Sequence, residues 1–492
     1  MKRLFIHTAL LLITGSALAQ VKPDLYDTDR LSPAFHAGRR AALREKMPPT
    51  SVAVFFANPE RNRNNDTDYQ YAQNPNLYYL TGYMEPNALL VITKEGVDVN
   101  GRQGTEFFFA QERNPAREAW TGRRLGKEGV ETTLGLKNVY LGKDFKNSPL
   151  DFTKFSRVLS LLPEGVVDAP RDSTDLYSLM EQFAAKTAGQ TPDARSLYAI
   201  MGQLRQVKLP EEMALLQKAI DISCQGHNEV MKFMEPGLTE YHAQSVMEYV
   251  FKSNGSEYVG YGSIAGGGEN ACVLHYVTNR RTLQDGDIFL ADCGAEYHGY
   301  TADVTRTIPV NGKFSPEQKA IYEIVLAAQE AGFNACQPNA PFRGIHQAAF
   351  AVVAAGLFKL GIAKDSAGVR RYFNHGTSHS LGLDVHDPMV PVGPAPAPGL
   401  LTASAGAAPA RAAGPSALNL MPGFVLTVEP GIYIPANSPC DPKWWNIGVR
   451  IEDDVLITET GHRILSASAP RTVADIEKMM TEQTTFKRPA KR

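Results

Sequence analysis

Short apolar runs alternate with helical stretches in the first part of the chain, from roughly residue 31 to residue 195. The runs 51–56, 88–93 and 106–110 are rich in β-branched and aromatic residues, which predicts three strands. The polar stretch 61–66 predicts a loop. Strands that alternate with helices are typical of an α/β layer, and we expect one here.

The pattern changes in the second part of the chain. The segment 210–212 (Pro-Glu-Glu) is typical of a first helical turn, because proline tolerates an early position and acids favour the positive end of the helix dipole. Apolar residues then recur at helical spacing between residues 213 and 220. We therefore predict a domain boundary between about residues 195 and 208, and two domains in all.

Acidic residues interrupt apolar, strand-like runs in the second part. A carboxylate surrounded by apolar side chains is costly unless it is neutralised, and a pair of divalent cations is the simplest means. The sequence therefore suggests a hydrolase with two metal ions. The acids concerned are Asp292, Asp303, Glu429 and Glu452.

Asp292 ends one of these runs, and Asp303 lies within the next one, residues 300–307. Two antiparallel strands joined through Gly294 and Gly299 would bring the two carboxylates together. Like charges at that distance would force one of them to take a proton, unless cations lie between them. A polar hairpin with an aspartate in its turn is the alternative, but Asp303 lies inside its run.

Three histidines, His375, His379 and His386, occupy twelve positions interleaved with glycine. A single histidine is more often structural, but three so close together suggest a site. Histidine is also the side chain that exchanges a proton near neutral pH.

Arg450 and Glu452 share one face of the run 447–453 by the two-residue strand period. Apolar residues alternate with them on the other face. Periodicity alone leaves a surface charge pair as an equal alternative. Only the combination with the other acids and histidines favours a metal site.

The bulk composition limits the partners. Of 492 residues, 50 are basic and 52 acidic, for a formal charge of −2, so no nucleic acid or membrane partner is expected. The five cysteines are scattered and form no Cys-x-x-Cys pair, which argues against a disulfide framework and a thiolate zinc site. One disulfide remains possible.

The ends of the chain and one internal stretch differ from the rest. Residues 1–19 carry two basic residues, a short apolar run and Ala17-Leu18-Ala19, which predicts a cleaved signal peptide and an exported, periplasmic or secreted protein. An uncleaved anchor would need roughly 20 apolar residues. The stretch 392–418 is rich in alanine and proline, has almost no large side chains and predicts a solvent-exposed flexible loop. Residues 471–492 predict a helix and a basic tail.

Four motifs in this order resemble the aminopeptidase P/prolidase branch of the pita-bread metallopeptidases. They are Asp-x10-Asp, His-x3-His-x6-His, Glu-Pro-Gly and Arg-x-Glu-Asp, within a resemblance from about residue 205 to residue 466. Residues 78–83 (Tyr-Tyr-Leu-Thr-Gly-Tyr) resemble the creatinase-like domain of these enzymes. The resemblance implies an α/β amino-terminal creatinase-like domain over 20–200 and an α+β pita-bread catalytic domain over 201–470.

The resemblance also implies a role for each motif residue. Asp303 and Glu452 match residues that bridge two metal ions, and Asp292 matches one that holds a single ion. Glu429 matches the acid that takes the proton of the attacking hydroxide. The implied metal ligands are Asp292, Asp303, His379, Glu429 and Glu452.

Further residues match positions that contact the substrate. His386 matches a residue that steadies the tetrahedral intermediate, and His275 matches another residue in contact with substrate. The implied wall of the proline pocket consists of His375, Tyr433 and Arg450.

The function expected from the resemblance is release of the first residue from peptides with proline in second position. A prolidase restricted to Xaa-Pro dipeptides is the alternative within the same fold, and a non-catalytic pita-bread binding module is a more remote one. The resemblance favours two manganese ions per subunit, with cobalt, zinc or iron possible, since ligand chemistry alone does not select among them. It also implies a homo-oligomer, either a dimer or a tetramer.

Overall fold

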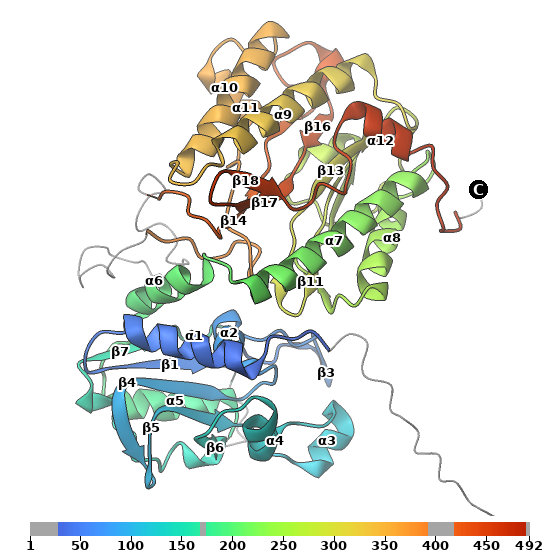
Figure 1. Cartoon of the computed structure of the whole chain (residues 1–492). Helices are drawn as coiled ribbons and strands as arrows, with labels where there is room; N and C mark the ends of the chain where they lie inside the picture. The colour runs from blue at the N-terminus through green and yellow to red at the C-terminus, as the bar shows by residue number, and fades with distance from the viewer. Residues whose placement is uncertain (1–27, 168–173, 392–417, 489–492) are drawn as a thin grey trace, which may run out of the picture. The chain divides into compact units, whose positions relative to one another are not determined.

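The computed structural model describes residues 28–167, 174–391 and 418–488 (Figure 1). The predicted signal peptide, the loop 392–418 apart from its last residue, and the final four residues of the basic tail lie outside the described residues. Within the described ranges, every helix is too short or too polar to cross a membrane.

The first part is built on a mixed five-stranded sheet in the order β6-β5-β4-β1-β7. Strand β1 pairs antiparallel with β4 and parallel with β7. The three strands predicted from the sequence are confirmed as β1, β4 and β5. The bounds are β1 Ser51–Phe56, β4 Leu89–Val99, β5 Arg102–Ala110, β6 Val139–Leu141 and β7 Arg157–Ser160.

Strand β1 is buried on both faces, as an α/β layer requires. Ala53 and Phe55 belong to the core that includes Leu43 of helix α1 (Pro33–Lys46). Residues 52, 54 and 56 belong to a second core with Phe183 of helix α5 (Leu176–Thr187). The period of two along the strand therefore places one helix on each side of the sheet.

The remaining elements of this part are short. The predicted loop 61–66 is wrong in part, because a small exposed hairpin forms between β2 (Asn62–Asn64) and β3 (Thr67–Asp68). The helices are α2 Pro75–Thr81, α3 Pro115–Thr121, α4 Gly126–Thr133, α6 Ala194–Arg205 and the 3-10 turns η1 Gly142–Asp144 and η2 Phe152–Lys154.

The second part places short sheets between two groups of helices (Figure 1). Helix α7 begins at Pro210, as predicted, and Glu212 accepts a hydrogen bond from the Leu209 amide at 3.0 Å. The domain boundary between 195 and 208 stays a prediction. The helices are α7 Pro210–Phe233, α8 Glu240–Ser253, α9 Pro316–Ala335, α10 Arg343–Lys359, α11 Ser366–Tyr372, α12 Val473–Met479 and the 3-10 turns η3 Gly268–Cys272 and η5 Pro442–Trp444.

The strands of the second part form four small antiparallel sheets, ordered β13-β10-β9, β12-β11-β8, β14-β17-β18 and β15-β16. Their bounds are β8 Tyr258–Val259, β9 Ile264–Gly267, β10 Ile288–Asp292, β11 Ala295–Tyr297, β12 Tyr300–Thr301, β13 Thr305–Pro309, β14 Val425–Val428, β15 Gly431–Ile434, β16 Ile447–Arg450, β17 Asp453–Ile457 and β18 His462–Ile464.

Two runs that the sequence predicts as continuous strands are each broken at the acidic residue. The run 300–307 splits into β12 and β13 with Asp303 between them, and Glu452 lies between β16 and β17. Two segments of the chain pass very close to each other here. A Cβ atom on Gly294 would lie only 1.8 Å from the carbonyl oxygen of Ala302. The predicted antiparallel pairing is nevertheless present, since Asp292 pairs with Thr305.

Candidate active site

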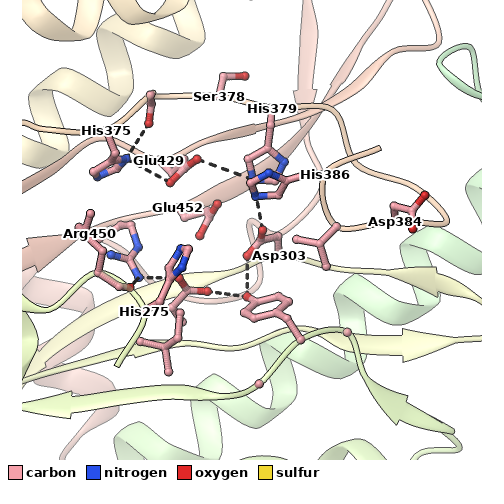
Figure 2. A pocket seen from close by; sticks show the side chains of 18 of the residues that line it. His275, Asp303, His375, Ser378, His379, Asp384, His386, Glu429, Arg450 and Glu452 are labelled. Atoms are coloured by element: carbon pink, nitrogen blue, oxygen red, sulfur yellow. Dashed lines mark hydrogen bonds and ion pairs between the residues drawn. The ribbon is translucent and has the colours of Figure 1, made fainter. Parts of the chain in front are cut away.

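A cavity of about 890 Å³ gathers the predicted site residues (Figure 2). All of them line it except Tyr433, whose hydroxyl lies 2.9 Å from Nε2 of the lining residue His375. They come from strands and loops that are far apart in the sequence. The lining residues predicted from sequence are His275, Asp292, Asp303, His375, His379, His386, Glu429, Arg450 and Glu452.

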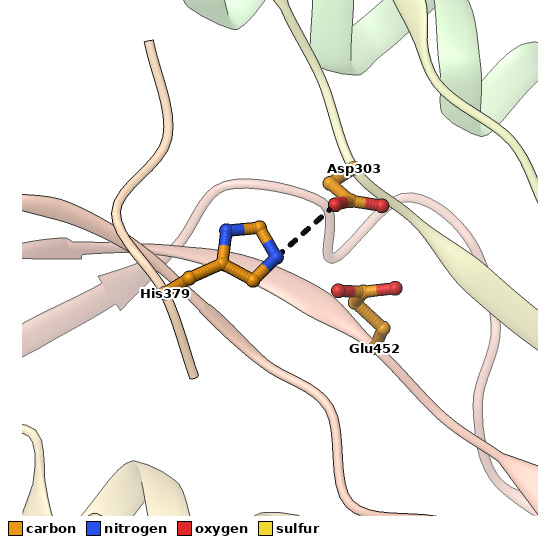
Figure 3. A group of neighbouring side chains, drawn as sticks. All are labelled: Asp303, His379 and Glu452. Carbon is orange, nitrogen blue, oxygen red and sulfur yellow. Dashed lines mark ion pairs between the residues drawn. The ribbon is translucent and has the colours of Figure 1, made fainter. Parts of the chain in front are cut away.

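Asp303, His379 and Glu452 form the centre of the site (Figure 3). One ligand atom from each residue lies within 4.8 Å of the other two. The Nε2 atom of His379 also lies 3.7 Å from Oε1 of Glu429. An isolated β-bridge between Thr305 and Glu452 brings Glu452 beside the segment 300–307, which contains Asp303.

The electrostatics of this centre favour a bound cation. Burial raises the pKa of Glu452, and the neighbouring Asp303 and Glu429 raise it further. Burial and Asp303 also raise the pKa of Glu429, although His379 opposes the shift. Burial is the largest cause of both shifts, and repulsion between the carboxylates adds to it; a divalent cation removes that repulsion. Carboxylate oxygens with one imidazole are a suitable donor set for manganese, cobalt, iron or zinc, so the residues fit a metal site.

Asp292 has different partners from the other three acids. Its Oδ2 atom accepts a hydrogen bond from the Arg450 guanidinium, and its Oδ1 atom accepts one from the Tyr261 hydroxyl. The same hydroxyl oxygen lies 2.5 Å from Oδ1 of Asp303, so its single proton is shared between the two carboxylates. Among the described residues, Arg450 is the only lysine or arginine that lines the cavity, whereas five carboxylates do, those of Asp292, Asp303, Asp384, Glu429 and Glu452.

The two flanking histidines are neutral near pH 7. Burial lowers the pKa of His386 to about 4, with a further contribution from the charge of His379. The rings of His386 and His379 stack with their centroids 4.0 Å apart. Burial also lowers the pKa of His375 to about 4, with help from Arg450.

His375, Tyr433 and Arg450 are joined by hydrogen bonds. Arg450 donates to the Tyr433 hydroxyl at 2.7 Å. That hydroxyl is therefore free to donate to Nε2 of His375, while Nδ1 of His375 donates to the Gly376 carbonyl at 2.6 Å. The order of donors and acceptors sets the tautomer of His375.

Two alternatives from the sequence are now settled. Arg450 and Glu452 are 3% and 1% exposed, so they are not a surface charge pair. Asp303 is buried and lies between two strands, so it is not the polar tip of a hairpin. All five cysteines are free thiols.

Sequence reasoning missed the residues that support the ligands. Thr305 donates from Oγ1 to Oε2 of Glu452 at 2.6 Å, and Tyr261 joins Asp292 and Asp303. Arg306 donates to the Glu452 carbonyl and to the Asp453 carboxylate, both at 2.6 Å. No spacing rule reveals these residues, because each contact joins segments that meet only in the fold.

Comparison with known proteins agrees with this geometry. The family "Metallopeptidase family M24" matches residues 214–459, and "Aminopeptidase P, N-terminal domain" matches residues 36–155. The chain belongs to metallopeptidase family M24. The predicted metallopeptidase class and the predicted fold, a creatinase-like domain followed by a pita-bread domain, are confirmed.

Relatives of this M24 peptidase extend over most of its length. It is 35% identical over 460 residues to the Xaa-Pro aminopeptidase of Escherichia coli K12, covering 90% of this chain and 96% of that protein. It is 33% identical over 480 residues to Xaa-Pro aminopeptidase 1 of Streptomyces coelicolor, covering 93% and 89%.

Solved structures show the same likeness. The E. coli aminopeptidase P with the inhibitor Pro-Leu has a TM-score of 0.77 at 34% identity, covering 92% of this chain and 98% of that chain. The aminopeptidase PepP of Pseudomonas aeruginosa has a TM-score of 0.75 at 34% identity, with the same two coverages.

Proposed function

We propose that this M24 peptidase is a Xaa-Pro aminopeptidase, which releases the first residue of peptides that have proline in second position. The observation that carries the proposal is the presence, in one cavity, of a metal-competent group and of a hydrogen-bonded wall beside it. The metal-competent group contains Asp303, His379 and Glu452. The wall contains His375 and Arg450, joined through Tyr433.

Two divalent cations are proposed to bind here, with manganese expected, held by the five predicted ligands. Bound divalent cations lower the pKa of water and polarise the scissile carbonyl. The chain's own contribution is to gather buried carboxylates in one cavity, where Asp292 is paired with Arg450 while repulsion raises the pKa values of Glu429 and Glu452. The proposed ligands are Asp292, Asp303, His379, Glu429 and Glu452.

Glu429 is proposed to accept the proton of the attacking water on a carboxylate oxygen. Its carboxylate lines the cavity, 3.7 Å from Nε2 of His379, and is therefore placed to accept a proton there. His386 is neutral at pH 7 and can donate an N–H to the carbonyl oxygen as negative charge develops there. A single donor of this kind contributes on the order of 3–4 kcal/mol to the transition state.

The wall suits proline because an Xaa-Pro bond has no N–H to be matched by an acceptor. In this wall the Tyr433 hydroxyl and the Arg450 guanidinium are already engaged with each other and with His375 and Asp292. The ring of proline can therefore lie against the wall without leaving a buried polar group unsatisfied.

We also propose export to the periplasm or the medium, on the basis of residues 1–19, and a dimeric or tetrameric assembly. Fractionation of cells, with and without residues 1–19, tests the first point. Sedimentation of the purified protein tests the second.

A peptide panel tests the function. Xaa-Pro dipeptides and Xaa-Pro-Xaa tripeptides are incubated with the enzyme and Mn, Co or Zn, beside Glu429→Ala and a control, Glu459→Ala, whose glutamate is exposed and remote from the cavity. We expect tripeptides to be cleaved, Glu429→Ala to be inactive and Glu459→Ala to match wild type. Cleavage of dipeptides alone would identify a prolidase instead.

A further inference from the structure

His275 lies in the segment 267–281, which begins at the last residue of β9, contains η3 and has neither helix nor strand from residue 273 to residue 281. Its side chain is exposed to the cavity. Among the described residues, it has no hydrogen-bond, ion-pair or ring partner. The position of its imidazole is therefore set by the backbone that carries it, and the contacts of that backbone decide where it lies.

One buried carboxylate, that of Glu240, accepts four hydrogen bonds from this segment. Its Oε1 atom accepts from the Gly267 amide at 2.8 Å and from Nδ2 of Asn270 at 2.9 Å. Its Oε2 atom accepts from the Tyr276 hydroxyl and from the Arg281 amide, both at 2.9 Å. The four donors lie on both sides of His275, and one belongs to its direct neighbour.

Glu240 is not needed to cap its own helix. It is the first residue of α8 and is fully buried. The capping is done by its neighbours, since Thr239 Oγ1 accepts from the His242 amide and His242 Nδ1 accepts from the Thr239 amide. The carboxylate of Glu240 therefore serves the segment 267–281.

A second anchor holds the far side of the same segment. The side chain of Asn279 accepts from the Ala265 amide and donates to the Ser263 carbonyl and to Oε1 of Gln244. Asn279 has φ of +53°, a conformation that asparagine tolerates better than most residues. The hydrogen bonds of Glu240 and Asn279 thus hold the backbone on both sides of His275 in place, while residues 277 and 278 stay exposed.

We propose that Glu240 is a positioning residue that acts on the substrate through His275, by fixing the segment 267–281 with its four hydrogen bonds. This inference rests on the proposed function, because the contact between His275 and substrate is the one that the resemblance to the aminopeptidase P branch implies. Hydrogen bonds to a charged carboxylate are about twice as strong as neutral ones, so four of them make this segment rigid.

The first test does not depend on activity. Hydrogen exchange is compared in wild type, Glu240→Gln and a matched control, Glu212→Gln, which changes another buried glutamate at the start of a helix. An amide in place of the carboxylate turns an NH2 group toward two of the four donors. We expect exchange of the 267–281 amides to rise about tenfold in Glu240→Gln alone. Unchanged exchange would overturn the proposal.

The second test is a double-mutant cycle on a Xaa-Pro-Xaa peptide. We expect Glu240→Gln to lower kcat/KM about tenfold in wild type but less than twofold in the His275→Ala background. Metal content is expected to stay the same, since Glu240 contacts none of the proposed ligands. Equal losses in both backgrounds would show a general structural role and contradict the proposal. If wild type cleaved no such peptide, the proposed function would fail, whereas the exchange experiment would still decide the role of Glu240.

Discussion

The Nε2 atom of His379 lies 3.4 Å from Oδ2 of Asp303, although the two residues belong to separate segments of the chain. Burial lowers the pKa of His379, but Asp303 and Glu429 outweigh it and raise the pKa to about 9. The imidazole of His379 therefore lies beside the carboxylate oxygens of Asp303 and Glu429, which are the oxygens that would bind a cation.

Replacing His379 with alanine removes the only nitrogen ligand of the proposed site. We expect the metal content and kcat/KM to fall by more than the roughly 10–100-fold that loss of an outer partner causes. Elemental analysis and peptide kinetics measure the two quantities. His462→Ala, outside the cavity, serves as the control and should retain both; equal metal content in the two variants would remove His379 from the ligand set.

Replacing Thr305 with valine removes the hydroxyl that donates to Glu452 and accepts from Nε of Arg450. The shape is kept, so the effect reports on orientation of the ligand. We expect metal affinity to fall by about 10–100-fold, as measured by titration with Mn. Thr305→Ser restores the hydroxyl and should recover most of the affinity. Failure of serine to do so would assign the effect to packing.

The raised pKa of Glu212 should make the free energy of unfolding depend on pH. Burial raises its pKa from 4.5 to about 7, against the lowering effects of Lys208, the Leu209 amide and Tyr300. Between these values the folded state holds a proton that the unfolded state has released, so the free energy of unfolding falls as pH rises through this window. Relative to Glu212→Gln, wild type should lose about 1–3 kcal/mol from pH 5 to pH 8. Urea unfolding at several pH values measures it; parallel curves would contradict the shift.

Arg306 is 1% exposed and pairs with the fully buried Asp453. It also donates to the carbonyl groups of residues 305, 452, 469 and 470. Arg306→Met leaves a buried carboxylate without its partner, and we expect a loss of about 3–5 kcal/mol in unfolding free energy. Lys143→Met breaks an exposed pair with Glu112 and should leave the urea midpoint unchanged. Similar losses of unfolding free energy in the two variants would show that burial of an ion pair does not determine the effect of breaking it.

Two glycines allow a matched comparison. A Cβ atom on Gly448 of β16 would lie 2.1 Å from the Ala271 carbonyl oxygen, whereas one on Gly344 of α10 would meet nothing within 4 Å. We expect Gly448→Ala to cost about 1–3 kcal/mol through overpacking. Gly344→Ala should instead stabilise by about 0.4–1 kcal/mol, because alanine restricts the unfolded chain. Thermal unfolding of both variants decides between these signs.

Much of the fold can be predicted because it depends on local patterns. The apolar run 51–56, the Pro-Glu-Glu start of α7 and the run that ends at Asp292 all form as expected. The breaks at Asp303 and Glu452 could not be predicted, since they arise where separate strands cross closely. The hairpin at 62–68 is polar and exposed, so no apolar alternation marks it.

The motifs formed by acids and histidines along the chain are enough to show the resemblance to the pita-bread metallopeptidases, and that resemblance implies nine of the residues that line the cavity. The partners that hold those residues follow from the way distant segments pack. Glu240 accepts from Tyr276, Thr305 donates to Glu452, and Tyr261 joins two carboxylates. A hydrogen bond acts over about 3 Å of space whatever the distance along the chain, so these contacts exist only once the chain has folded.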